Sequence, residues 1–226
     1  MNAIKTAVDG VVIIEPRIFE DARGYFFESF SQREFDEKVA THLSPFNSQL
    51  SIRFVQDNES KSSYGVMRGL HFQRPPFTQS KLVRCVKGAV LDVAVDIRKG
   101  SPTYGQHVEC LLCANDEEGE RIANEIKNDP KKSESLNFQF STFNSQFGLQ
   151  FFVPRGFAHG FAVLSETAVF QYKCDEFYHP EAEGGISILD DSLGIEWRIH
   201  TKHAILSEKD TKHALLKDFN SPFTYE

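Results

Sequence analysis

The chain has 226 residues, of which 40% are hydrophobic and 25% are charged, as in an ordinary soluble globular protein. Its formal net charge of -7 excludes a general nucleic-acid binder, because such proteins carry basic faces. No apolar run is long enough to span a membrane, and the first residues lack the apolar core of a signal peptide. We therefore expect a cytoplasmic protein that contacts neither membranes nor nucleic acids.

The composition also favours sheet over helix. The chain has 21 phenylalanines but only two methionines and one tryptophan, and its apolar runs are short. Its four cysteines, Cys85, Cys110, Cys113 and Cys174, lie in apolar or strand-like runs and are predicted to be reduced, buried thiols. The C-x-x-C spacing of Cys110 and Cys113 does not predict a zinc site, because no second pair follows.

The first predicted elements are two short strands. Val11–Ile14 is predicted to be an edge strand, because the nearby Pro16 cannot donate a hydrogen bond to a central ladder. A turn at Asp21–Gly24 leads into a second strand at Tyr25–Phe30.

A short helix and a polar strand follow. Ser31 can cap a helix over 32–42, and the next strand is predicted at Phe54–Asn58. Beyond it, 65–73 and 81–88 place a histidine, two arginines and two lysines among short apolar runs. Polar groups on sheet positions suit a pre-organised small-molecule site, although a surface hairpin would show the same pattern.

The clearest alternation lies in the strand predicted at Val90–Ile97. One face carries Leu91, Val93, Val95 and Ile97, and the other carries Val90, Asp92, Ala94 and Asp96. This pattern predicts one buried face and one face that lines something polar. A further strand is predicted at His107–Cys113.

Residues 115–146 break the strand pattern. They are charged, rich in breakers and poor in apolar periodicity, and loops of this length are uncommon in compact domains. We therefore predict a single domain over 1–226 with an insertion at 115–147, to which we assign no chemistry.

The remaining chain returns to sheet. Strands are predicted at Leu149–Val153, Phe161–Leu164 and Thr167–Cys174, and in the last of them Tyr172 falls on the apolar side. Ser207 is predicted to cap a final helix. Many short strands separated by turns, without a βαβ rhythm, predict a sandwich or barrel.

The common phosphate-binding and nucleophile motifs are missing from the sequence. The polar residues fall instead in seven blocks, Asp21–Glu28 (DARGYFFE), Val55–Asn58 (VQDN), Val66–Gln73 (VMRGLHFQ), Lys81–Val86 (KLVRCV), Asp92–Arg98 (DVAVDIR), Val153–Phe161 (VPRGFAHGF) and Leu206–Asp210 (LSEKD). In this order, over nearly the whole chain, they resemble the dTDP-4-dehydrorhamnose 3,5-epimerase family.

That resemblance implies an all-β fold, a jelly-roll, cupin-like β-sandwich with a few short peripheral helices, which acts as a homodimer. It also implies 3,5-epimerisation of a dTDP-linked 4-keto-6-deoxy sugar, without a cofactor, in dTDP-L-rhamnose synthesis. The family normally joins the strand near Cys113 to the strand near Phe152 by a short turn, so the segment 115–147 departs from its pattern.

The resemblance assigns catalytic roles to four residues. Epimerisation next to a ketone removes a proton from one face of a carbon and returns a proton to the other. A histidine suits the neutral base because its ordinary pKa is about 6.5; the resemblance makes His71 that base and Asp210 the group that orients it. Tyr172 is the acid on the opposite face, and Lys81 is the cation beside the C4 oxygen.

Ten further positions match the family's ligand contacts. Arg23 and Arg68 match pyrophosphate-binding arginines, whose planar forks suit phosphate oxygens, and Tyr178 matches the residue that stacks on thymine. The others are Glu28, Gln56, Asp57, Asn58, His159, Glu183 and Lys209.

Each assignment has a structural alternative, such as a core tyrosine at Tyr172 or a surface charge at Lys81. At the level of function, two alternatives stay open. One is a related mono-epimerase or ketoisomerase on a similar dTDP-keto sugar. The other is a non-catalytic protein that binds sugar nucleotides.

Two geometric expectations follow. On a regular strand Arg68 and His71 face opposite sides, so both reach one pocket only if a bulge intervenes, and Gly69 is the expected place. We expect no metal, because an H-x-H pair is missing after His71, and His200 and His203 have no carboxylate at ligand spacing.

Overall fold

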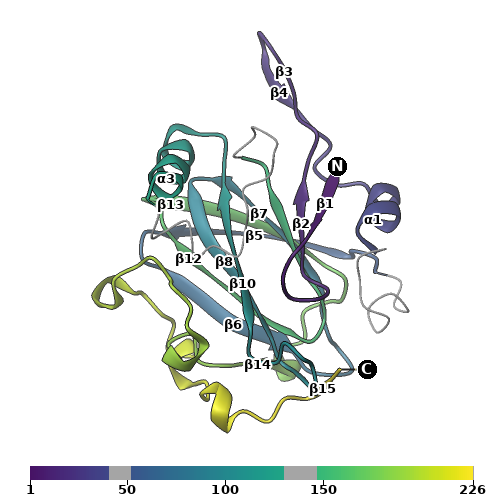
Figure 1. The fold of residues 1–226 in the computed structure, drawn as a ribbon, viewed down its shortest axis with the longest axis vertical. Helices are drawn as coiled ribbons and strands as arrows, with labels where there is room; N and C mark the ends of the chain where they lie inside the picture. The colour runs from purple at the N-terminus through teal and green to yellow at the C-terminus, as the bar shows by residue number, and fades with distance from the viewer. Residues whose placement is uncertain (41–51, 130–146, 226) are drawn as a thin grey trace.

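Two antiparallel sheets form the body of the molecule (Figure 1). The computed structural model describes residues 1–40, 52–129 and 147–225. The six-stranded sheet has the order β1 (Asn2–Lys5), β2 (Val12–Glu15), β11 (Gln150–Val153), β7 (Lys81–Lys87), β13 (Thr167–Cys174) and β5 (Gln56–Ser63). The five-stranded sheet has the order β10 (His107–Cys113), β8 (Ala89–Asp96), β12 (Phe157–Val163), β6 (Met67–Gln73) and β14 (Glu183–Gly185).

From β5 to β14 the chain crosses repeatedly between these two sheets, although β10 follows β8 within the five-stranded sheet. β5, β7, β11 and β13 belong to the six-stranded sheet, whereas β6, β8, β12 and β14 belong to the five-stranded one. Repeated crossing between two packed sheets is the arrangement of a double-sheet jelly roll. The predicted all-β sandwich is therefore confirmed, and one cluster of buried side chains draws on both sheets.

The described residues contain two α-helices, α1 (Gln32–Lys38) and α3 (Glu117–Lys127), and the 3-10 turns η2 (Pro180–Ala182), η3 (Asp191–Leu193), η4 (Thr201–His203), η5 (Asp210–Lys212) and η6 (Leu216–Asp218). The helix α1 begins as predicted, since Ser31 accepts a hydrogen bond from Glu34 N at 3.4 Å. It ends earlier than predicted, with Val39 already its C-cap. Residues 41 and 42 of the predicted helix lie outside the described residues.

The helix α3 lies in the first part of the predicted insertion, where no helix was predicted. Asp116 caps it by accepting a hydrogen bond from Gly119 N at 2.7 Å. Ile122 and Ile126 are buried, and the helix packs on β8 and β10. A narrow apolar stripe is enough to form this helix, and the surrounding charges hid it in the sequence. Residues 130–146 of the predicted insertion lie outside the described part of the chain.

Two strand predictions also need correction. β2 is not an edge strand, since it lies between β1 and β11. Pro16 follows the last residue of β2, so its missing N–H removes no ladder bond. The edges of this sheet are β1, which lies beside β2, and β5, which continues through polar residues to Ser63 with alternating exposure. Its solvent-facing polar side chains are what shortened the predicted strand.

The strand β8 is buried along its whole length, between β10 and β12. The prediction of a buried face is confirmed, but the polar face is buried as well. There Asp92 Oδ1 lies 2.7 Å from His159 Nε2, and Asp96 accepts hydrogen bonds from Arg98.

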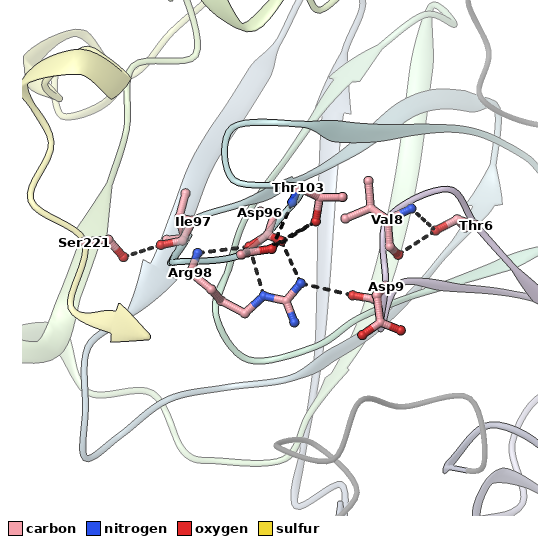
Figure 2. A network of polar contacts seen from close by, with 9 residues as sticks. Thr6, Val8, Asp9, Asp96, Ile97, Arg98, Thr103 and Ser221 are labelled. Atoms are coloured by element: carbon pink, nitrogen blue, oxygen red, sulfur yellow. Dashed lines mark hydrogen bonds and ion pairs between the residues drawn. The ribbon is translucent and has the colours of Figure 1, made fainter. Parts of the chain in front are cut away.

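A buried polar network ties both ends of the chain to β8 (Figure 2). Arg98 donates to the Asp96 carboxylate from Nε at 2.9 Å and from Nη2 at 2.6 Å, and its Nη2 also donates to the Asp9 carbonyl at 3.1 Å. Ser221 Oγ donates to the Ile97 carbonyl. Beside this network, β15 (Phe223–Thr224) pairs in parallel with β9 (Arg98–Lys99).

A two-stranded hairpin of β3 (Phe19–Asp21) and β4 (Gly24–Phe26) projects from the body (Figure 1). The strand predicted at 25–30 is therefore shorter than expected. The hairpin exposes large apolar side chains, Phe19 at 50%, Tyr25 at 50% and Phe26 at 69%. Clustered exposed aromatic residues are typical of an interaction surface.

All four cysteines are buried and free, as predicted. No helix within the described ranges has the length and hydropathy needed to cross a bilayer.

Candidate active site

A cavity of about 520 Å³ opens between the two sheets. Strands of both sheets line it, together with the segment 205–210. Its polar lining includes Ser60, Arg68, His71, Lys81, His159, Tyr172, Ser207, Lys209 and Asp210. The structure therefore brings all four predicted catalytic residues to one cavity, with three of the predicted binding residues.

His71 and Asp210 meet across 139 residues of sequence, with His71 Nε2 only 2.5 Å from Asp210 Oδ1. Ser207 Oγ donates to Asp210 Oδ2 at 2.8 Å. Burial favours a higher pKa for Asp210, but the hydrogen bonds from His71 and Ser207 outweigh it and lower the pKa. An ionised carboxylate can only accept, so Nε2 of His71 carries the hydrogen and the lone pair lies on Nδ1.

Ser207 acts differently from its predicted role. No α-helix follows it, only the 3-10 turn η5, whose N-cap is Lys209 without a side-chain hydrogen bond. Ser207 instead accepts from Asp210 N at 3.2 Å while donating to the same residue's carboxylate. Ser207 therefore orients Asp210 toward His71.

A bulge in β6 lets Arg68 and His71 reach the same cavity. Against β12, His71 pairs with His159 and Arg68 with Phe161, so β6 has one extra residue over this interval. Gly69 takes a φ of 127°, and a Cβ added there would lie 2.5 Å from the β12 backbone. Only glycine suits both conditions. The bulge predicted at Gly69 is confirmed.

Tyr172 reaches the cavity from the opposite sheet. It lies on β13 two residues after Phe170, whose ring stacks on Phe161 at 4.3 Å between centroids. Burial raises the pKa of Tyr172, and the nearby Arg68 opposes this only in part. The phenol therefore stays protonated at neutral pH. A histidine and a tyrosine thus face one cavity from two sheets.

Lys81 joins the cavity from β7. Burial lowers the pKa of Lys81 despite the neighbouring Cys174, Glu183 and Asp92. A lysine with a lowered pKa donates a proton more readily to a developing oxyanion. His159 is held by Asp92, whose own pKa is raised by burial and only partly lowered by that histidine.

A chain of polar contacts extends the site beyond the cavity. Lys209 is paired with Glu183, and Glu183 Oε2 accepts from the Tyr178 hydroxyl at 2.7 Å. That hydrogen bond is the largest cause that raises the pKa of Tyr178 to about 12. Gln56 accepts from Tyr178 N at 3.2 Å and donates to Asn58 Oδ1 at 2.9 Å. Five predicted binding residues therefore form one continuous array.

A second hollow, of about 370 Å³, shares Tyr172 with the larger cavity. Asp57 and Asn58 line it, and so does Arg84, which sequence reasoning did not select. Asp57 is paired with Lys173 at 2.7 Å. Both hollows therefore meet at the tyrosine.

Arg23 and Glu28 do not reach the cavity of their own chain. Arg23 lies in the projecting hairpin with its side chain 89% exposed, and it pairs with Asp21. Glu28 follows β4 and is exposed. The structure separates these two residues from the other predicted binding residues.

Sequence reasoning missed His213, which lies three residues after Asp210. Its ring meets the His71 ring edge-on, with 5.6 Å between centroids and 71° between planes. Burial, and then the nearby His71, lower the pKa of His213. The only available signal was its proximity to Asp210.

The fold and the cavity define a jelly-roll protein with an acid–base site between its sheets. The sequence profile of the dTDP-4-dehydrorhamnose 3,5-epimerase family matches residues 5–126 and 130–218. The chain therefore belongs to this family, whose members are isomerases.

Individual relatives agree along most of the chain. The dTDP-4-dehydrorhamnose 3,5-epimerase of Escherichia coli (strain K12) is 42% identical over 212 residues, which cover 94% of this chain and 92% of the relative. The crystal structure of the enzyme of that name from Elizabethkingia anophelis is 43% identical, with a TM-score of 0.76 and coverage of 98% and 99%. A Legionella pneumophila dTDP-6-deoxy-D-glucose-3,5-epimerase in complex with dTDP-4-keto-L-rhamnose is 40% identical, with a TM-score of 0.76 and coverage of 100% and 98%.

Proposed function

We propose that this protein converts dTDP-4-dehydro-6-deoxy-D-glucose to dTDP-4-dehydro-L-rhamnose by epimerisation at C3 and C5. One observation carries the proposal: His71 on β6 and Tyr172 on β13 line the same cavity from opposite sheets. A base and an acid on opposite walls can serve the two faces of one sugar ring. Family membership supplies the substrate class.

The first step removes a proton from a carbon next to the C4 ketone. Nδ1 of His71 takes the proton, and the ionised Asp210 stabilises the imidazolium that forms. The electron pair moves onto the C4 oxygen, where the Lys81 ammonium stabilises the developing negative charge.

The second step returns a proton to the opposite face of the carbon. Tyr172 gives its hydroxyl hydrogen to the enolate, and the ketone re-forms as the configuration inverts. The phenolate then regains a proton from solvent, and the His71 imidazolium releases the proton that it took, so both groups return to their starting states. The raised pKa of Tyr172 keeps its hydroxyl protonated at neutral pH until the enolate forms.

The nucleotide binds beside the cavity. Arg68 reaches the cavity and suits the pyrophosphate, while Tyr178, Glu183, Lys209, Gln56 and Asn58 form the array that continues from it. His159 lines the sugar end, and Asp57 belongs to the adjoining hollow.

The active form is a homodimer in which the hairpin of one subunit completes the site of the other. Three observations support this: the hairpin projects, its aromatic residues are exposed, and Arg23 and Glu28 stay outside the cavity of their own chain. A partner's copy of this region can bring a second arginine and a second carboxylate, those of Arg23 and Glu28, to the cavity. Sedimentation should give a dimer, and Phe26→Asp should yield monomers that bind dTDP more weakly.

The reaction is tested in heavy water. The protein is incubated with dTDP-4-keto-6-deoxyglucose, and NMR follows deuterium at C3 and C5. We expect uptake at both carbons with formation of the L-rhamno product. Uptake at only one carbon would indicate a mono-epimerase, and dTDP binding without any uptake would indicate a binding protein.

The cellular location that we propose is the cytoplasm. Four thiols that stay free and buried suit a reducing compartment.

A further inference from the structure

We propose that His71, Asp210 and His213 form a binding site for a single zinc ion at the edge of the cavity. Each residue offers one ligand atom, and these atoms all lie within 4.8 Å of one another. Two histidines and a carboxylate are the ligand set of many zinc sites that keep a fourth position open. His71 and Asp210 line the cavity, which gives the ion a path to the site.

His213 is the residue that makes this set. Its Nε2 is buried and, within the described part of the chain, has no hydrogen-bond partner. A buried ring nitrogen without a partner is costly, and a metal ion would satisfy it. The ring of His213 also fills the space next to β14, because a Cβ added at Gly185 would lie 2.6 Å from this Nε2. Gly185 pairs with His71, so His213 is held beside the proposed base.

The ligand spacing requires only small movements. Zinc bonds of about 2.1 Å to nitrogen and oxygen place tetrahedral ligand atoms about 3.4 Å apart. His71 and Asp210 must separate slightly from their present 2.5 Å, and the third atom must move closer. Lys209, whose charge acts on His213, is already paired with Glu183, so its repulsion of a cation is reduced.

The bound ion would prevent His71 from acting as a base. Zinc at Nε2 of His71 uses the lone pair of that nitrogen, so the single N–H of the neutral ring moves to Nδ1, which then has no lone pair to take a proton. Zinc would therefore inhibit the epimerase, and this consequence rests on the proposed role of His71. The binding site itself does not depend on that role.

Direct binding is measured first, on the full-length protein without substrate. Zinc is titrated against a chromophoric chelator, and cobalt is added separately to record the visible bands of tetrahedral Co²⁺. We expect one ion per chain, and a loss of affinity of at least about tenfold in both His213→Ala and His213→Gln. Circular dichroism and thermal melting without metal establish that the variants are folded.

His200→Ala is the matched control, because His200 is exposed and lies outside the cluster but near His203. Its zinc affinity should equal that of the wild type. Zinc affinity that is unchanged in both folded His213 variants, or lost only in His200→Ala, would overturn the proposed site.

Deuterium uptake is then measured with and without zinc. Zinc should slow deuterium uptake by the wild-type protein, and a chelator should restore it. In His213→Ala, zinc should slow uptake less, relative to the metal-free rate of that variant. If zinc binds as proposed but uptake is not slowed, the site stands and the role of His71 as the base is wrong.

Discussion

Two short charged contacts involve the five-stranded sheet. They differ in their exposure and in whether a polar atom is left free to react. Asp96 and Arg98 are 2.6 Å apart with side chains 0% and 1% exposed, whereas His71 and Asp210 are 2.5 Å apart with side chains 26% and 3% exposed. The Asp96 carboxylate also accepts hydrogen bonds from Ser101 and from Thr103, of which Thr103 is labelled in Figure 2, so both of its oxygens are engaged. The His71 ring uses one nitrogen for Asp210 and keeps the other for chemistry.

This difference separates a structural pair from a reactive one. A sealed pair offers no route for a proton, so Asp96 and Arg98 can only hold the chain together. The pair of His71 and Asp210 opens on a cavity, and it joins β6, which carries His71, to the 3-10 turn η5, which carries Asp210. The contact with Asp210 serves to orient His71 as a base. The two pairs should therefore respond oppositely when stability and turnover are measured on the same variants.

The largest effect is expected for turnover in His71→Ala. Loss of the base should slow deuterium uptake at C3 and C5 by roughly a thousandfold, or about 4 kcal/mol of transition-state stabilisation. The affinity for dTDP should stay near that of the wild type, because the nucleotide contacts lie elsewhere. NMR and calorimetry measure the two quantities, with His200→Ala as the control. Undiminished uptake would remove His71 from the role of base.

Breaking the buried pair of Asp96 and Arg98 should have the opposite effect, a loss of stability rather than of turnover. Asp96→Asn leaves the Arg98 charge buried without its partner and should lower the free energy of unfolding by about 3 kcal/mol. Deuterium uptake per folded molecule should stay at the wild-type rate. Urea titration measures the loss, and Glu208→Gln, which breaks the exposed pair with Lys212, should change little. A stable Asp96→Asn variant with lost turnover would reverse the assignment of the two pairs.

Local sequence rules predicted the parts of this comparison that lie within one strand. The bulge at Gly69 followed from Arg68 and His71 having to share a pocket, and the inward side of Tyr172 followed from alternation along β13. The helix α3 was missed because its apolar stripe is narrow. β2 was misplaced at an edge because Pro16 was counted as part of the strand.

Contacts between distant segments were harder to predict. Asp210 was placed at the site only through the family resemblance, and no periodicity joins it to His71. His213 lies beside the same histidine because the carboxy-terminal segment crosses β14, which the sequence does not reveal. The position of Arg23 on a projecting hairpin depends on tertiary packing for the same reason.

A smaller effect is expected in Tyr172→Phe. Loss of the hydroxyl should slow the return of a proton to carbon by roughly a hundredfold. The abstraction of the proton from carbon should slow less. NMR separates the two steps, because exchanged starting sugar reports removal and the inverted sugar reports return. Thr167→Ser, at the other end of β13, is the control. Equal loss of both steps would contradict the division of labour between the two sheets.

The smallest effect is expected in the stability of Asp210→Asn. The hydrogen bonds from His71 and Ser207 keep the pKa of Asp210 below its ordinary value of 3.8, so its carboxylate stabilises the fold above that pH. At pH 7 the variant should lose about 1 kcal/mol of unfolding free energy. The difference should close as the pH falls below 3.8 through the folded-state pKa, because the wild-type carboxyl then takes up a proton and its charge is lost. Urea titrations at pH 7 and at a series of pH values below 3.8 measure the gap. A gap that stays constant through this series would mean that packing, not charge, holds Asp210. In contrast to Asp96→Asn, Asp210→Asn should lose turnover far out of proportion to stability, since the carboxylate mainly orients the imidazole and stabilises its cation.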